Sequence, residues 1–282
     1  MNFSRLLVVI AGLALAMVVP STARAQGSLF ITGHDTDDHG NGDYQRAGLD
    51  FLFFGSTANI AQAATRSTFK VGFLGTGNAS TSGAAVSGYT NRTFIDINTS
   101  LATAFTGGYD ALIIGTGGDY VSFADSGLLN SSAASFTSYF NAGGRLFVNS
   151  EQGIGQSFYN FLPPFGVSVG SSISNSGVFS ATAAGLLIGL TEAIVDADIT
   201  HTTFTGVNAV LFTVFETYNV DGSAVAIGLR NGSIIGGGGP GGGFVGGTTP
   251  VPEPSTYGLM GALALVGAVW VRRRKEAAAA AS

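Results

Sequence analysis

The chain has 282 residues, no cysteine and only 10% charged residues. Without cysteine it has no disulfide framework, no thiol nucleophile and no thiolate metal site. Residues 26–249 contain 15 acidic and 6 basic residues, a net charge of −9. This acidic balance argues against binding to nucleic acid or to anionic lipid.

The amino end predicts a secretory signal peptide over residues 1–25. Arg5 provides the positive charge, residues 6–19 form an apolar run, and Ala23-Arg24-Ala25 is a small-residue site that signal peptidase accepts. We expect cleavage after Ala25 and export through the inner membrane. An uncleaved membrane anchor is the alternative.

Residues 26–235 predict one α/β globular domain. Apolar runs that are separated by helical spacings are typical of a doubly wound, mostly parallel sheet with helices on both faces. After Glu151 the pattern loosens, and the later strands suit antiparallel pairing. The expected strands are residues 28–33, 70–75, 93–97, 111–115, 145–149, 210–218 and 224–229, and the expected helices are residues 44–54, 99–105, 131–141 and 183–195.

Two segments carry a family resemblance. Residues 109–115 read Tyr-Asp-Ala-Leu-Ile-Ile-Gly, and residues 143–148 read Gly-Gly-Arg-Leu-Phe-Val. With the glycine-ended first strand, they make residues 28–160 similar to the class I glutamine amidotransferase-like, flavodoxin-type architecture. That resemblance implies a catalytic cysteine after the strand at 145–149, where this chain reads Asn-Ser-Glu-Gln-Gly, so we expect no amidotransferase chemistry.

The most polar stretch follows the first predicted strand. It offers the candidate metal ligands His34, Asp35, Asp37, Asp38 and His39. Carboxylates suit calcium or magnesium and imidazoles suit zinc, so a divalent cation is the candidate cofactor. The EF-hand pattern is not met because its closing glutamate is missing. The alternative is a solvated loop whose Asp side chains cap turns and the next helix.

A second candidate ligand-binding loop follows the strand at 111–115. Gly117 and Gly118 would let backbone N–H groups face a ligand, and Asp119 adds a carboxylate. Neither the P-loop nor the dinucleotide-binding fingerprint is present. A tight turn between strand and loop is the alternative.

Ser150 and Glu151 occupy the turn after the strand at 145–149. Glu151 joins the candidate ligand-binding residues. Ser150 lacks the Gly-x-Ser-x-Gly elbow, and the sequence cannot place a histidine beside it. His201 is a candidate helper for a hydrolase, or a structural histidine.

The carboxyl end predicts a sorting signal after a glycine-rich linker at residues 236–250. The residues Val251, Pro252, Glu253 and Pro254 precede an apolar run at 257–271 and the basic cluster at 272–275. The apolar run is a short candidate transmembrane helix whose basic end stays in the cytoplasm, and residues 276–282 form a cytoplasmic tail.

This arrangement resembles the PEP-CTERM sorting signal of Gram-negative bacteria. The resemblance covers residues 250–275 and implies recognition by an exosortase, with processing near the Pro-Glu-Pro sequence. It also implies transient anchoring in the inner membrane, placement at the cell surface or outside the cell, and association with exopolysaccharide and biofilm. An ordinary single-pass anchor is the alternative.

Two functions therefore compete for the middle domain. In the first, it is a non-catalytic surface or matrix component that binds polysaccharide or a cation. In the second, it is a metal-assisted extracellular hydrolase that uses the loop at residues 34–43. Convergence of these side chains in one pocket would favour the second function.

Overall fold

A computed structural model describes residues 26–38, 41–55, 63–76, 88–116, 120–150, 155–173, 178–197 and 200–246, without the side chains of residues 123, 167–173, 200 and 201. Arg24–Gly247 forms one compact unit. The predicted signal peptide, sorting signal and membrane-spanning run lie outside the described residues. Within the described residues, no helix is long and apolar enough to cross a bilayer.

Five strands form the parallel half of a mixed sheet, in the order β3-β2-β4-β5-β1. All five were expected from the sequence. Four of them, β1, β2, β4 and β5, are buried, apart from Arg145 at the start of β5, and read as nearly continuous apolar segments, as strands covered on both faces do, whereas the edge strand β3 is partly exposed. Leu146 on β5 lies opposite both Leu29 and Leu112, so the middle of this half is apolar across the strands. The strands are β1 (Gly27–Thr32), β2 (Val71–Gly75), β3 (Arg92–Asp96), β4 (Ala111–Ile114) and β5 (Arg145–Val148).

The flavodoxin-type architecture is not confirmed by this strand order. In that architecture the order is 2-1-3-4-5, with the first strand inside the sheet beside the second. Here β2, β3, β4 and β5 are arranged like strands 1, 2, 3 and 4 of that order, and β1 occupies the place of strand 5, beside β5. The first strand of the chain therefore closes the parallel half instead of starting it.

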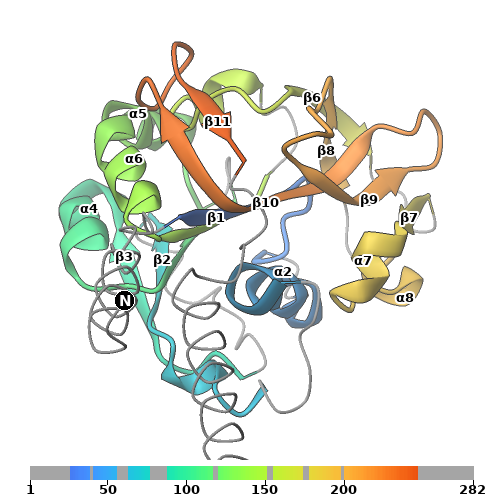
Figure 1. Cartoon of the computed structure of the whole chain (residues 1–282), viewed down its shortest axis with the longest axis horizontal. Helices are drawn as coiled ribbons and strands as arrows, with labels where there is room; N and C mark the ends of the chain where they lie inside the picture. The colour runs from blue at the N-terminus through green and yellow to red at the C-terminus, as the bar shows by residue number, and fades with distance from the viewer. Residues whose placement is uncertain are drawn as a thin grey trace, which may run out of the picture. The chain divides into compact units, whose positions relative to one another are not determined.

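Helices cover both faces of the parallel half, as the sequence predicted (Figure 1). On one face, α2 (Gly42–Phe54) begins at Asn41, whose side chain accepts a hydrogen bond from the backbone of Tyr44 at 3.1 Å. It lies so close to the sheet that a Cβ atom on Gly48 would approach the Phe147 ring to 2.3 Å. The opposite face is covered by α4 (Ile97–Thr106), α5 (Phe123–Ser131) and α6 (Ala133–Asn141).

An antiparallel half continues the sheet from β1. Its central strand is β10, which pairs with β1 along one edge and with β9 along the other (Figure 1). Beyond the end of β1, β10 also meets β8, and β8 pairs with β6. The strands of this half are β6 (Val167–Ile173), β7 (Phe179–Ala181), β8 (Thr200–Thr205), β9 (Thr213–Tyr218), β10 (Ala224–Ile235) and β11 (Gly243–Val245).

The sequence predicted this half less well. The helix expected at residues 183–195 is two short helices, α7 (Ala183–Leu187) and α8 (Glu192–Val195), because Gly189 between them has φ of 92°. Strands β6, β7 and β8 were not expected, since their Ser, Thr and Gly residues hide the apolar alternation. The strand expected at residues 224–229 continues to Ile235.

The glycine-rich segment is partly folded, which corrects its interpretation as a linker from residue 236 onward. Gly236, Gly237 and Gly239 take positive φ values in a turn, and β11 then pairs antiparallel with β10. Phe244 is 6% exposed and packs against Phe140, with ring centroids 5.9 Å apart. Phe244 therefore anchors a segment whose glycines have no side chains to pack.

We predict that Phe244→Ala destabilises the domain by about 3 kcal/mol, because it removes a buried ring and leaves a cavity. Val245→Ala is the matched control, since Val245 is partly exposed on the same strand. Urea denaturation measures both variants. Equal effects of the two substitutions would contradict the packing role of β11.

Candidate functional site

The carboxyl ends of three parallel strands bring the polar loops of the sequence together. Thr36, after β1, donates its hydroxyl to Asn149 Oδ1, after β5, at 2.7 Å. The backbone N–H of Ser150 donates to the His34 carbonyl at 3.2 Å. The backbone N–H of Thr116, after β4, donates to Asp37 Oδ2 at 2.9 Å. The loops after β1, β4 and β5 therefore meet at this edge of the sheet, and the contacts of their side chains decide what they can do chemically.

His34 belongs to a buried network that the sequence did not predict. Its Nε2 lies 2.8 Å from Oε1 of Glu216 on β9, and both side chains are fully buried. The Tyr44 hydroxyl of α2 donates to Glu216 Oε2. Thr32 Oγ1 donates to the Tyr44 hydroxyl at 3.1 Å and accepts the His34 backbone N–H at 3.1 Å. We call Thr32, His34, Tyr44 and Glu216 the His34–Glu216 network.

The network supplies a partner to each carboxylate oxygen of Glu216. Glu216 accepts from His34 and from Tyr44, one at each carboxylate oxygen, so the buried acid has two close hydrogen-bond partners. The His34 ring also packs edge-on to the Tyr44 ring, with centroids 4.7 Å apart. The only sequence signal for Glu216 was a single acid inside the apolar strand Thr213–Tyr218. A lone acid there requires a partner, but the sequence does not say which one.

Asp37 is the most perturbed acid at this edge. It is 1% exposed, and it receives hydrogen bonds from the Thr116 backbone and hydroxyl. Burial raises the pKa of Asp37 from 3.8 to about 7, the negative charge of Asp35 adds to the rise, and the hydrogen bonds from Thr116 oppose it. Near neutral pH this carboxyl group therefore exists in both protonation states.

The predicted metal ligands do not share one centre where the structure describes them. His34 faces Glu216, Asp37 is held by Thr116, and Asp38 accepts a hydrogen bond from the Tyr120 hydroxyl at 2.7 Å. No group of three or more His, Cys, Asp or Glu side chains among the described residues has the arrangement of a metal site. His39 lies outside those residues. The proposed divalent cation thus has no ligand set in the described part of the loop.

Several other candidates also fall outside the described residues. They are Gly117, Gly118, Asp119 and Glu151, together with the sorting residues Val251, Pro252, Glu253 and Pro254. For His201 the structure describes the β8 backbone but not the side chain. This backbone does reach the first loop, because the N–H of Thr202 donates to the Gly33 carbonyl at 3.3 Å.

Ser150 has the environment of a structural serine. It is fully buried, and its hydroxyl shares a hydrogen bond with the hydroxyl of Tyr159. A serine nucleophile needs a histidine base within hydrogen-bond reach. The described ring of His34 is directed to Glu216 instead.

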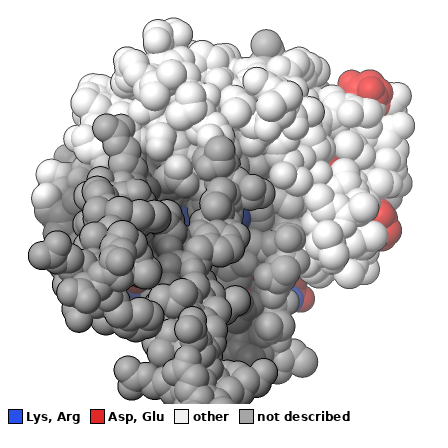
Figure 2. Space-filling model, viewed as in Figure 1, with Lys and Arg blue, Asp and Glu red and all other residues white. Residues whose placement is uncertain are grey.

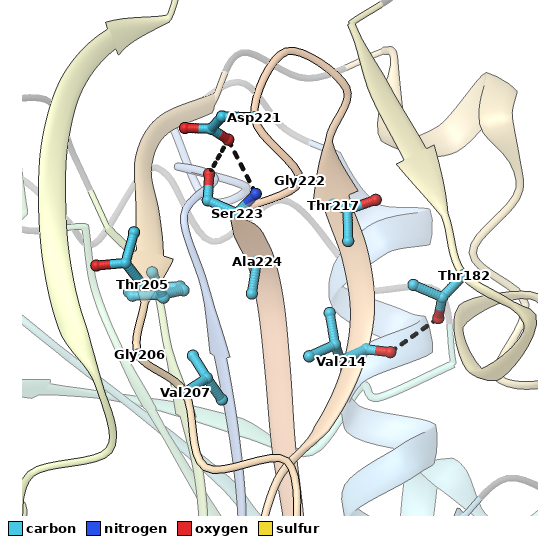
Figure 3. A pocket seen from close by; sticks show the side chains of 11 residues that line it. Thr182, Thr205, Gly206, Val207, Val214, Thr217, Asp221, Gly222, Ser223 and Ala224 are labelled. Carbon is cyan, nitrogen blue, oxygen red and sulfur yellow. Dashed lines mark hydrogen bonds between the residues drawn. The ribbon is translucent and has the colours of Figure 1, made fainter.

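A surface groove of about 450 Å³ lies elsewhere, where β8, β9 and the start of β10 meet (Figure 3). Apolar side chains line its lower part, including Val207, Val214 and Ala224. At its upper rim, Asp221 accepts hydrogen bonds from the backbone N–H and hydroxyl of Ser223, at 2.9 and 2.6 Å. These contacts lower the pKa of Asp221 and stabilise the turn that carries it. None of the candidate residues from the carboxyl edge lines this groove.

We predict that Glu216→Ala lowers the free energy of unfolding by about 3–5 kcal/mol, as expected when one partner of a buried hydrogen-bonded pair is removed. Tyr44→Phe should cost less, and a double-mutant cycle between the two positions should show non-additivity. Glu192→Gln, which changes an exposed acid on α8, is the control. Additive effects of Glu216→Ala and Tyr44→Phe would mean that the network is not cooperative.

We also predict a pH dependence of stability from Asp37. The unfolded chain titrates this carboxyl near 3.8 and the folded chain near 7, so the folded state binds more protons between these values. The contribution of Asp37 to the free energy of unfolding therefore falls as the pH rises from about 4 to about 7. Asp37→Asn should raise the melting temperature relative to wild type at pH 8, and the difference should shrink toward pH 4.

The exposed neighbour Asp38 supplies the control for that experiment, as Asp38→Asn changes a carboxyl that lies at the surface. Melting curves are recorded for the wild type and both variants across the same pH range. A difference between Asp37→Asn and wild type that does not change with pH would show that the pKa of Asp37 is not raised.

Comparison with known proteins identifies one segment of the chain. The family model for the PEP-CTERM protein-sorting motif matches residues 250–275, the same residues that the sequence predicted. No match to the chain was found among curated proteins or among solved structures. The amidotransferase-like resemblance of residues 28–160 therefore has no support from these comparisons. The chain carries a PEP-CTERM sorting motif, which implies exosortase-dependent sorting to the bacterial cell surface and an exosortase as processing partner.

Proposed function

We propose that this protein is a non-catalytic component of the bacterial surface or extracellular matrix that an exosortase delivers through the PEP-CTERM motif. Signal peptidase would remove residues 1–25. Residues 257–271 would hold the chain briefly in the inner membrane, and processing near Pro252, Glu253 and Pro254 would follow. The match at residues 250–275 carries this proposal.

The internal contacts of the domain support a non-catalytic role. Enzyme sites place their acid, base and nucleophile where a substrate can reach them. In this domain the His34–Glu216 network and Ser150 are fully buried. Their hydrogen-bond partners are other side chains of the fold, so these residues support the sheet from inside.

A second ionic cluster, which is partly buried, also has its hydrogen-bond partners within the fold. Asp50 on α2 is 4% exposed and accepts hydrogen bonds from Arg66 Nε at 2.8 Å and from the Tyr89 hydroxyl at 2.9 Å. Another Arg66 nitrogen, Nη2, lies 2.5 Å from the second carboxylate oxygen. The two nitrogens of Arg66 bind both oxygens of Asp50, which joins the segment before β2 to α2, and Tyr89 joins the segment before β3 to the same helix. Such a pair stabilises a fold and leaves no oxygen directed toward a substrate.

Exopolysaccharide is the partner that we propose for the displayed domain. The domain has a net charge of −9, which disfavours nucleic acid and anionic lipid as partners. A neutral polysaccharide does not meet this repulsion. Association with biofilm follows from this proposal.

A metal-assisted hydrolase that uses the loop at residues 34–43 is the second candidate function. The perturbed pKa of Asp37, at the carboxyl edge of a parallel sheet, is the observation that favours it, because catalytic acids are often shifted toward neutral pH. The test is the metal content and melting temperature of the purified protein with calcium, magnesium or zinc. A stoichiometric metal that is lost in Asp37→Ala/Asp38→Ala would favour the hydrolase over the non-catalytic component.

We predict that Pro252→Ala/Glu253→Ala/Pro254→Ala blocks processing, so that the unprocessed chain accumulates in the membrane fraction. Thr248→Ala/Thr249→Ala, just before the matched motif, is the control and should be processed normally. Immunoblots of membrane, surface and medium fractions measure both, in a host with its exosortase and in a strain without it. Normal surface delivery of the triple variant, or of wild type without exosortase, would contradict the sorting proposal.

A further inference from the structure

The outer edge of β6 is the feature that points beyond the proposed function. The path of paired strands runs from β3 at one end to β6 at the other, and among the described strands β6 pairs only with β8. A terminal strand presents backbone N–H and C=O groups that another strand can pair with. Proteins usually protect such an edge with charge, proline, a bulge or a covering segment.

The two ends of the sheet differ in this protection. At one end, β3 begins with Arg92 and ends with Asp96. At the other end, β6 reads Val-Ser-Val-Gly-Ser-Ser-Ile, without charge or proline. Within the described residues, a bulge between Gly170 and Ile173 interrupts its pairing with β8 and leaves Val167–Gly170 in regular register. Four consecutive residues therefore offer a regular outer edge.

The distribution of charge along the chain favours a second copy as the partner of β6. Residues 152–191 contain no Asp, Glu, Lys or Arg, although residues 26–249 carry a net charge of −9. Figure 2 shows the face of the described residues in this view as mostly white, with red atoms toward the right margin. Two copies of an acidic domain repel each other over most of their surface. They can approach with the least repulsion where this uncharged segment of each copy faces the other.

We propose that two copies of this chain associate through β6, with the strands antiparallel across a two-fold axis and the sheet continuing from one copy into the next. A two-fold contact uses the same surface on both copies, so an uncharged strand is compatible with itself without any complementary charge. The proposed contact between copies uses Val167–Gly170, the residues that are in regular register with β8. Because this stretch is short, the dimer is weak and depends on protein concentration.

The absence of cysteine from the chain gives a direct test. Residues that face each other in an antiparallel pair have Cα atoms about 4.5–5.5 Å apart, within the range that a disulfide spans. Single substitutions Val167→Cys, Ser168→Cys, Val169→Cys and Gly170→Cys are introduced into the full chain, and intact cells are treated with diamide as the oxidant. Thr93→Cys, at an exposed position on the opposite edge strand β3, is the matched control.

We expect a disulfide-linked dimer of twice the chain mass at one or two neighbouring β6 positions, several-fold more abundant than for Thr93→Cys. A sharp maximum along the strand indicates a fixed register about the two-fold axis. Dimer yields that equal the Thr93→Cys yield at every β6 position would overturn the proposal. A cross-linked product of any other mass would overturn it too, because β6 would then contact a different protein.

A charge variant provides a second, independent measurement. Ser168→Lys places like charges near each other at the two-fold contact, so the purified full chain in detergent should sediment as a monomer at concentrations where wild type dimerises. Thr93→Lys should leave the dimer intact, and melting curves establish that both variants fold. Equal dimerisation of wild type and folded Ser168→Lys would refute pairing through β6. If Ser168→Lys does not fold, the cysteine series still decides the question.

Discussion

The buried pairing of His34 with Glu216 is the interaction on which the arrangement of this domain depends. Glu216 comes from the antiparallel half of the sheet, and His34 directly follows the first parallel strand. Removing a carboxylate from water is costly unless nearby donors replace its hydration. Both oxygens of Glu216 have such donors, from His34 and Tyr44, only when β1, α2 and β9 are all in place. The acid therefore requires one specific junction between the two halves of the sheet.

The position of β1 explains why several polar residues that follow the parallel strands are buried. In an open parallel sheet, the crevice beyond the carboxyl ends of the strands holds the ligand. Here β10 runs antiparallel beside β1, and Val225 and Thr202 form backbone hydrogen bonds with Gly33 at 2.7 and 3.3 Å. The antiparallel strands thus occupy part of the space that a ligand would need. The same topology that continues the sheet turns His34, Thr36 and Asp37 into internal groups.

Delivery and display follow from different physical properties of the chain. Sorting depends on a short linear segment at residues 250–275, which an enzyme reads without reference to the fold. The displayed part is the domain, which has an acidic balance over residues 26–249 and an uncharged segment at residues 152–191.

Features that depend on the local order of residues could be predicted from the amino-acid sequence. Continuous apolar runs identified β1 to β5, and the linear motif identified the sorting segment, because neither requires distant residues. It also placed the polar loop at a strand end. The place of β1 between β5 and β10, and the packing of Phe244 that anchors a glycine-rich segment, became known only from the folded chain. It alone brought Glu216 to His34 across 182 positions of sequence. Such partners are chosen by the energy of burial and pairing in the folded chain, and no local pattern of residues encodes that choice.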